Sequence, residues 1–182
     1  MRRAGPRSPH DPRNHQDVGA CWAVVSEGRL VNASLRRAIM VSLAGMPEPV
    51  ALLHVPALSD VAEYAYAATV DPPARLIFTA GACPLDAEGR TVAPGDHAAQ
   101  ARQVMTNLET ALEASGARLT DVVKTTVYVA SSRQADLVTA WEVVRDFFGD
   151  HDPPSTLLGV AVLGYTDQLV EVEAVAAVRT GA

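Results

Sequence analysis

Cysteine is scarce in this sequence, and long apolar runs are missing. Cys21 and Cys83 are the two cysteines among 182 residues. They are too few for a disulfide framework and lack the paired spacing of a zinc site, so we expect two free thiols. No apolar run approaches the roughly 18 to 20 residues that span a bilayer, and the N-terminal region shows no apolar core with a cleavage signature. These absences favour a cytoplasmic protein that does not associate with membranes.

Motifs for nucleotide cofactors and metals are absent as well. Neither G-x-G-x-x-G nor G-x-x-x-x-G-K-[ST] occurs, and the five histidines form no i, i+4 pair. No G-x-S-x-G element supports a hydrolase nucleophile. We therefore expect no metal and no cofactor. His97 is interpreted as a surface residue in the first turn of a helix, and Cys83, which has no base or cation nearby in the sequence, as a small buried residue.

Charge is divided unevenly along the chain. Residues 1–39 hold seven arginines against three acids, whereas residues 40–182 hold eight basic and eighteen acidic residues. Nucleic-acid binding depends on clustered Lys and Arg, so the acidic part of the chain argues against such a partner. With 48% apolar residues the chain can bury a full core, and we expect residues 40–182 to form a single domain.

The first 39 residues differ from the rest in composition. They are rich in Arg, Pro and Gly and show no sustained hydrophobic period, which predicts a disordered extension. A second hypothesis is that translation starts at Met40 or Met46 and that the preceding segment is an incorrectly assigned extension.

Hydrophobic periodicity predicts two helices and six strands. The first helix, residues 96–115, has Asp96 as its N-cap, an apolar stripe that includes Met105 and Leu108, and Gly116 as its C-terminal stop. Ser131 or Ser132 is expected to cap the second helix. The predicted strands are residues 50–56, 64–70, 75–81, 121–130, 156–163 and 169–178, and the second helix spans residues 133–149.

This order of elements predicts an α+β fold. We expect one mixed six-stranded sheet with both helices on a single face. Residues 156–163 are almost uniformly apolar, as expected for a strand buried on both sides. Because no helix remains to cover the second face, we expect another copy of the chain to do so in a closed homo-oligomer.

Two glutamates interrupt the most apolar part of the chain. At i and i+2 of a strand, Glu171 and Glu173 point to the same face, about 6.6 to 7 Å apart. A solvent-facing strand would explain both. If the uncovered face meets another subunit, however, at least one carboxylate lies in or near an interface cleft, where it is costly unless it is hydrogen-bonded or used.

Four segments together resemble the RidA/YjgF family of reactive intermediate deaminases, also called endoribonuclease L-PSP-like proteins. The similarity runs from Val50 to Val178 and implies a chorismate-mutase-like fold, a homotrimer and ligand clefts between subunits. The segments are RLIFTAGACPLDAEGR (75–90), AAQARQVMTNLETALEASGARLTDVVKTTVYVAS (98–131), FFGDHDPPSTLLGVAVL (147–163) and LVEVEAVAAV (169–178).

The resemblance also implies an activity and a set of site residues. The best-known members hydrolyse 2-imino acids to 2-keto acids and ammonia, without metal or cofactor. The family's water-positioning glutamate falls on Glu171, and its backbone-contact glycine falls on Gly81. Tyr64, Leu157 and Trp141, which stands where asparagine is common, fall on the substrate-binding cleft.

Ser155 departs from the family pattern. Active deaminases carry an arginine there, in patterns such as P-A-R, whose guanidinium holds the substrate carboxylate. A serine cannot make this bidentate contact, and losing a hydrogen bond to a charged group costs about 1.5 to 3 kcal/mol.

Three functions therefore stay open. The first is a divergent deaminase or hydrolase that acts on a small imine or enamine lacking a carboxylate, with weak or no activity on 2-imino acids. The second is a non-catalytic trimer that binds a small molecule. The third is a ribonuclease, which fits poorly with the acidic domain.

Overall fold

The computed structural model describes residues 48–180, apart from Asp60 and Ala62. The expectations for residues 1–39 and for a start at Met40 or Met46 lie outside the described residues. Within them, the elements are β1 (Val50–Leu53), β2 (Ala67–Val70), β3 (Ala74–Phe78), α2 (His97–Ala114), the short 3₁₀ helix η1 (Leu119–Asp121), β4 (Val122–Val129), α3 (Gln134–Phe148), β5 (Ser155–Gly159) and β6 (Val170–Arg179).

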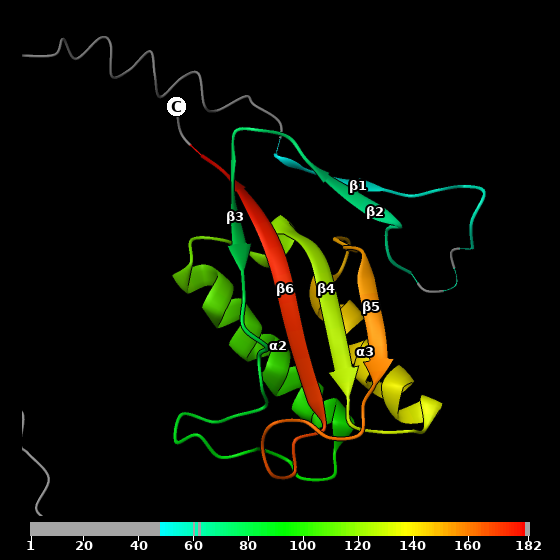
Figure 1. Cartoon of the computed structure of the whole chain (residues 1–182), viewed down its shortest axis with the longest axis vertical. Helices are drawn as coiled ribbons and strands as arrows, with labels where there is room; N and C mark the ends of the chain where they lie inside the picture. The colour runs from blue at the N-terminus through cyan, green and yellow to red at the C-terminus, as the bar shows by residue number, and fades with distance from the viewer. Residues whose placement is uncertain (1–47, 60, 62, 181–182) are drawn as a thin grey trace, which may run out of the picture. The chain divides into compact units, whose positions relative to one another are not determined.

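The central sheet has four strands in the order β3-β6-β4-β5 (Figure 1). β4 pairs with β5 in parallel, and β6 runs antiparallel to both of its neighbours, so the sheet is mixed and the fold is α+β. The predicted single six-stranded sheet is wrong, because β1 and β2 form a separate two-stranded sheet. Pro72 and Pro73 stand between β2 and β3, and prolines have no N–H to donate to a strand ladder.

The helices were predicted closely, because their end signals are strong. The Asp96 side chain accepts a hydrogen bond from the backbone N–H of Ala99 at 2.9 Å, and Gly116, just beyond α2, has a φ of 75°. Both helices lie on the same face of the four-stranded sheet (Figure 1). The buried stripe of α2 that faces the sheet consists of Ala101, Val104, Met105, Leu108 and Leu112.

The second helix begins differently from the prediction. Its N-cap is Arg133 instead of a serine, although the hydroxyl of Ser131 accepts a hydrogen bond from the Arg133 backbone N–H at 3.0 Å. The same hydroxyl donates to Asp136 Oδ2 at 2.6 Å, and the Arg133 guanidinium donates to both oxygens of that carboxylate. The Ser131 hydrogen bond, followed by the Arg133 guanidinium, lowers the pKa of Asp136.

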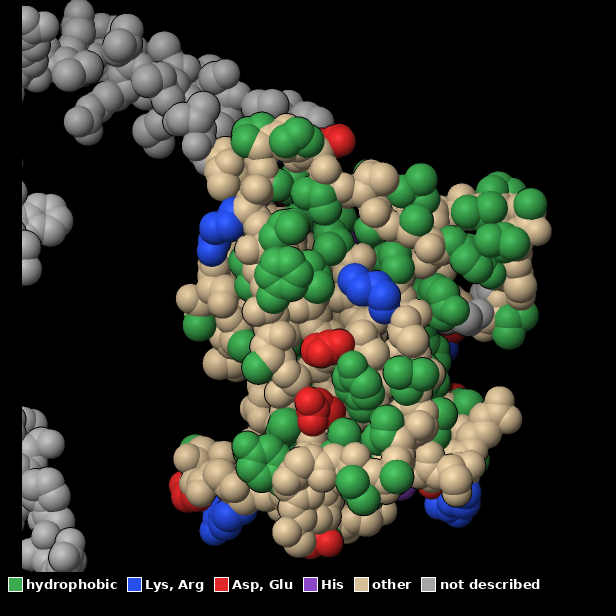
Figure 2. All heavy atoms as spheres, in the orientation of Figure 1, with side chains coloured by type: hydrophobic (Ala, Val, Ile, Leu, Met, Phe, Trp, Pro, Cys, Tyr) green, Lys and Arg blue, Asp and Glu red, His purple; other side chains and the backbone are tan. Residues whose placement is uncertain are grey.

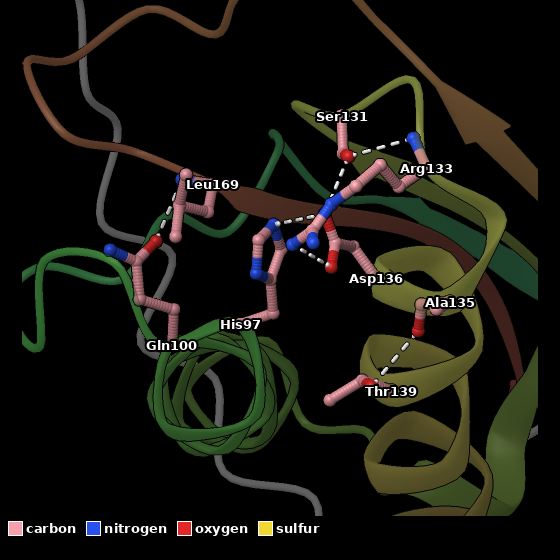
Figure 3. Close-up of polar contacts among 8 residues, drawn as sticks. All are labelled: His97, Gln100, Ser131, Arg133, Ala135, Asp136, Thr139 and Leu169. Carbon is pink, nitrogen blue, oxygen red and sulfur yellow. Dashed lines mark hydrogen bonds and ion pairs between the residues drawn. The ribbon is translucent and has the colours of Figure 1, made fainter.

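His97 does not lie on the surface as predicted. It projects from the start of α2 towards Asp136 at the start of α3 (Figure 3), with its Nε2 3.9 Å from the Asp136 Oδ2 atom. Only 14% of the His97 side chain is exposed. The residue therefore lies between the starts of the two helices, with its Nε2 atom buried and without a hydrogen bond among the described residues.

The face of the sheet opposite the helices is open in the single chain. Along β6, Val172 and Ala174 are buried towards the helices, while Glu171 and Glu173 alternate with them and point to the open face. This face also carries exposed apolar side chains (Figure 2). Phe78 of β3, which pairs with Val175 of β6, is 72% exposed. An apolar sheet face with charged groups near its centre needs a covering surface.

Candidate functional site

Glu171 lies near the start of β6, where a glutamine from the preceding loop holds it. The side chain of Gln168 donates a hydrogen bond from Nε2 to Glu171 Oε2 at 2.9 Å. The carbonyl oxygen of the same amide accepts from the Tyr165 backbone N–H at 3.0 Å. The amide therefore links the backbone of the loop to one oxygen of the carboxylate.

A second, fully buried glutamine fixes this loop to α2. Gln100 Nε2 donates to the backbone oxygen of Asp167 at 2.8 Å, and its Oε1 accepts from the backbone N–H of Leu169 at 2.7 Å. Figure 3 shows the second of these bonds. Because α2 belongs to the core, the position of Gln168, and through it of Glu171, is tied to the rigid part of the domain.

Gly81 lies directly against the Glu171 carboxylate. A Cβ atom at position 81 would stand 1.8 Å from Oε1 and 2.6 Å from Cδ of Glu171, so no other residue fits unless the carboxylate moves. Backbone hydrogen bonds between Ala82 and Val172, at 2.8 and 3.2 Å, hold the two segments together. The structure thus brings together the two residues to which the family resemblance assigns water positioning and backbone contact.

Cys83 also contacts this carboxylate, which the sequence did not indicate. Its Sγ lies 3.6 Å from Glu171 Oε2, and it is half-buried instead of fully buried. Burial first, and then the Glu171 charge, raise the pKa of the Cys83 thiol. A thiol with a raised pKa is a poor nucleophile, so the arrangement favours the carboxylate as the reactive group.

Glu173, the other glutamate of the pair, has a different environment. Its Oε1 accepts a hydrogen bond from the Tyr128 hydroxyl at 2.9 Å. The pKa of Lys124, on the same face of β4, is lowered by burial and raised to a smaller extent by the Glu173 charge. Lys124 donates to the Thr156 hydroxyl at 2.9 Å. Glu173 is therefore bonded to a tyrosine hydroxyl, whereas Glu171 is bonded to the Gln168 amide.

The other predicted site residues gather at a second place, between α3 and the edge strand β5. Tyr64, Trp141, Ser155 and Leu157 all line one groove of about 680 Å³. The rings of Tyr64 and Trp141 meet edge to face, with centroids 5.9 Å apart. Four of the predicted substrate-binding residues therefore share one concave surface, and their role in binding stays a prediction.

Ser155 is held by its neighbours at the start of β5. Its hydroxyl lies 2.5 Å from the Thr125 hydroxyl and donates to the Pro153 carbonyl oxygen at 3.0 Å. A short neutral side chain that is already hydrogen-bonded cannot supply the charge of an arginine. The groove therefore has no cation at the position where the resemblance implies one.

The groove does contain a cation that the sequence analysis missed. Arg145 of α3 lines it, one turn after Trp141, and its guanidinium forms ion pairs with Glu63 and Asp146. The sequence contained a signal for this residue: Trp141 and Arg145 are four residues apart, a spacing that places both side chains on the same face of a helix.

The two sets of residues are separate within one chain. The lining of the groove includes neither Glu171 nor Gly81. Leu157 lies on the core-facing side of β5, where it packs against the core, whereas Glu171 points to the open face of the sheet. A single copy therefore presents a carboxylate on one face and a groove at the edge.

The described residues contain neither a cluster of metal ligands nor a membrane-spanning helix. Between residues 48 and 180, no three His, Cys, Asp or Glu side chains gather closely enough to hold a metal ion. In the same part of the chain, neither α2 nor α3 has the length and apolar character to cross a bilayer.

Comparisons with known proteins agree with one another. The family model described as Endoribonuclease L-PSP matches residues 57–178. A RutC family protein of Pyrococcus horikoshii is 37% identical over 100 residues, which cover 55% of this chain and 77% of that protein. The 2-iminobutanoate/2-iminopropanoate deaminase of Escherichia coli is 36% identical over 107 residues, covering 57% of this chain and 80% of the deaminase.

Solved structures give the same result for the fold. A Rid-family protein of unknown function from Yersinia pestis superposes with a TM-score of 0.65 at 27% identity, over 70% of this chain and 98% of that chain. Escherichia coli TdcF, crystallised with bound serine, has a TM-score of 0.51 at 31% identity, over 64% of this chain and 88% of that chain. The similarity thus extends from sequence to backbone.

Proposed function

Because the chain belongs to the endoribonuclease L-PSP family, which includes the RidA/YjgF proteins, we propose that it hydrolyses a small imine or enamine to a carbonyl compound and ammonia, without a cofactor. The observation that carries this proposal is the Glu171 carboxylate, which lies against Gly81 with one oxygen held by Gln168. The 36% identity to the Escherichia coli deaminase supports the same class of reaction.

The geometry of Glu171 suits the activation of water. Its Oε2 atom accepts the Gln168 hydrogen bond, and no hydrogen bond among the described residues occupies Oε1. A water on Oε1 would transfer a proton to the carboxylate as its oxygen attacks the C=N carbon, and the Glu171 carboxyl group would then pass this proton to the nitrogen. The resulting carbinolamine expels ammonia as the C=O bond forms, so one water is consumed for each ammonia released.

The groove and Glu171 would meet only when copies of the chain associate. We place the reaction in a cleft where the groove of one subunit faces the carboxylate of the next, in a homotrimer. The open apolar sheet face supports this arrangement, since exposed Leu76 and Phe78 need a cover. A monomeric mass by light scattering at micromolar concentration would refute it.

Ser155 limits the substrates that this cleft can use. Without a guanidinium at position 155, 2-imino acids lose the contact that holds their carboxylate, which lowers the rate constant by about ten- to 150-fold. We expect weak or no acceleration of 2-imino acid hydrolysis by the wild-type protein, and a preference for imines whose binding does not depend on that contact.

The test uses 2-iminopropanoate generated in place by an amino-acid oxidase, with release of pyruvate as the measurement. Ser155→Arg should raise the rate by about ten- to 150-fold, whereas Ser155→Ala, which removes the hydroxyl contacts without adding a charge, should not. Glu171→Gln should abolish the gain in the Ser155→Arg background. A rate that is unchanged by Glu171→Gln would contradict the proposed role of the carboxylate.

A non-catalytic small-molecule-binding trimer is the alternative function. Two observations favour it: the absence of arginine at position 155, and the serine bound to the related TdcF protein. If the wild-type protein and the Ser155→Arg variant both fail to hydrolyse imines but bind small amino acids or keto acids, this alternative is correct. Cleavage of RNA in the same preparations would instead support the ribonuclease hypothesis.

A further inference from the structure

We propose that Arg145 is the anion-binding residue of the groove, and that the Glu63 carboxylate occupies its guanidinium until a ligand carboxylate displaces it. This inference deepens the proposed function and rests on it, because it names small carboxylates as ligands of the same cleft. It places the cation on α3, whereas the family resemblance implies a cation on β5. A carboxylate held by Arg145 binds on α3 and not at position 155, so weak hydrolysis of 2-imino acids is still expected.

The position of Arg145 supports this assignment. It is the one basic residue in the groove lining, and it also lines a smaller cavity together with Tyr64, Trp141 and Ser155. About 35% of its side chain is exposed, so the guanidinium is accessible from the groove. A guanidinium N–H that faces the groove can donate a charge-assisted hydrogen bond to a ligand carboxylate, which is stronger than a bond between neutral groups.

The contact with Glu63 resembles a bound ligand. Glu63 Oε2 accepts a hydrogen bond from Arg145 Nη1, while Arg145 Nε and Nη2 donate to Asp146 outside the groove lining, at 3.3 and 3.0 Å. Because Glu63 lines the same groove, its carboxylate lies where the carboxylate of a small ligand would pair with Nη1. The guanidinium thus already holds an anion within the site.

A ligand can readily displace the Glu63 carboxylate from Arg145. Its side chain is 60% exposed, and an exposed ion pair contributes little to stability. Its backbone φ of 52° lies in the left-handed region, which is unfavourable for a residue with a Cβ atom. A ligand that replaces the Glu63 carboxylate therefore meets a modest competitor.

Acidic residues in the groove raise the opposite possibility, that it binds a cation between Tyr64 and Trp141. Glu63 is already paired with Arg145, which leaves Glu142 as the remaining acid in the lining. One exposed carboxylate is a weaker basis for recognition than a guanidinium whose Nη1 already holds a carboxylate oxygen in the groove. The experiment below therefore includes a cationic probe, whose preferential binding would support the opposite possibility.

The experiment measures binding by isothermal titration calorimetry on the full-length protein, with pyruvate, its neutral analogue pyruvamide, and propylamine as probes. The wild-type protein should bind pyruvate more tightly than pyruvamide. Arg145→Gln should weaken pyruvate binding by about ten- to 150-fold, the loss expected for a hydrogen bond to a charged group. Glu63→Gln should strengthen it by about 1.5- to fivefold, the value of an exposed ion pair.

Glu142→Gln is the matched control, because it removes the same charge from the same groove and leaves Glu63 and Asp146, the ion-pair partners of Arg145, in place. Its effect on pyruvate affinity should be smaller than that of Glu63→Gln. Equal effects of the two variants, equal affinities for pyruvate and pyruvamide, or preferential binding of propylamine would each overturn the inference. Unfolding curves of the Arg145→Gln variant establish that it is folded.

The two proposals fail in different ways. If no imine is hydrolysed but pyruvate binding follows Arg145 and Glu63 as expected, the proposed reaction is wrong and the anion site stands. If imine hydrolysis is observed and pyruvate affinity is unchanged in Arg145→Gln, the reaction stands and the anion site is wrong.

Discussion

Replacing Gly81 with alanine tests the contact on which the candidate site depends. The new Cβ would lie 1.8, 2.6 and 2.9 Å from Oε1, Cδ and Cγ of Glu171, so the carboxylate must leave its position. The atoms in the way belong to a flexible side chain, and the domain should still fold. Moving the carboxylate breaks the 2.9 Å hydrogen bond from Gln168, which is worth about 1.5 to 3 kcal/mol for a charged acceptor.

Gly164→Ala is the matched control for this substitution. The nearest atom to a Cβ at position 164 is Gln168 Oε1 at 4.0 Å, an ordinary contact. Its stability should be unchanged or raised by up to about 1 kcal/mol, because alanine restricts the unfolded chain. Relative to Gly164→Ala, we expect Gly81→Ala to lower the free energy of unfolding by about 1.5 to 3 kcal/mol in urea titrations.

A double-mutant cycle gives the decisive measurement. In a Glu171→Ala background, the three clashing atoms are gone, so Gly81→Ala should cost almost nothing. If Gly81→Ala is equally destabilising with and without the glutamate side chain, the backbone around position 81 is responsible and the reasoning from the carboxylate is wrong. In the Ser155→Arg background, Gly81→Ala should also reduce imine hydrolysis to the level of Glu171→Gln.

Two further predictions follow from shifted pKa values. Because the Glu171 charge helps to raise the pKa of Cys83, Glu171→Gln should lower that pKa. Alkylation of Cys83 by iodoacetamide at pH 8, measured by peptide mass spectrometry, should then be faster. An unchanged rate would show that burial alone raises the pKa. The lowered pKa of Asp136, due first to Ser131 and then to Arg133, stabilises the fold above the ordinary aspartate pKa, and this stability is lost as the pH falls through the lowered value. Asp136→Asn should therefore reduce the unfolding midpoint in urea at pH 7, with the difference from wild type shrinking below about pH 4; a constant difference would exclude a charge effect.

Helix boundaries were predictable from the sequence because their signals are local. Asp96 caps the start of α2 by a side-chain hydrogen bond, and Gly116 follows its end with a positive φ. Both effects act within a few residues. Sheet organisation depends on pairing between distant segments, and here the prediction was wrong. β2 has suitable residues for a central sheet, yet Pro72 and Pro73 separate it from β3, and it pairs with β1 alone.

The candidate site was predictable where a role depends on one position in a strand. Glu171 and Gly81 occupy paired segments of β6 and of the chain after β3, so matching each to a family motif was enough to bring them together. Gln168 and Cys83 were missed, because their contacts with the carboxylate arise from the path of two loops. Loop geometry has no periodic signal in a sequence.

Arg145 is a cation in the groove that the comparison of position 155 with the family motif could not reveal. A motif comparison examines one position at a time, and at position 155 it finds serine in place of the cationic arginine. A binding groove depends only on a charge reaching the right point in space, and an adjacent helix can supply it. Trp141 and Arg145 are one turn apart on α3, and the strand that begins at Ser155 forms the opposite wall of the same groove. Loss of a motif arginine therefore predicts loss of carboxylate binding only when the neighbouring helix offers no other cation, and here α3 carries a guanidinium paired with an exposed glutamate.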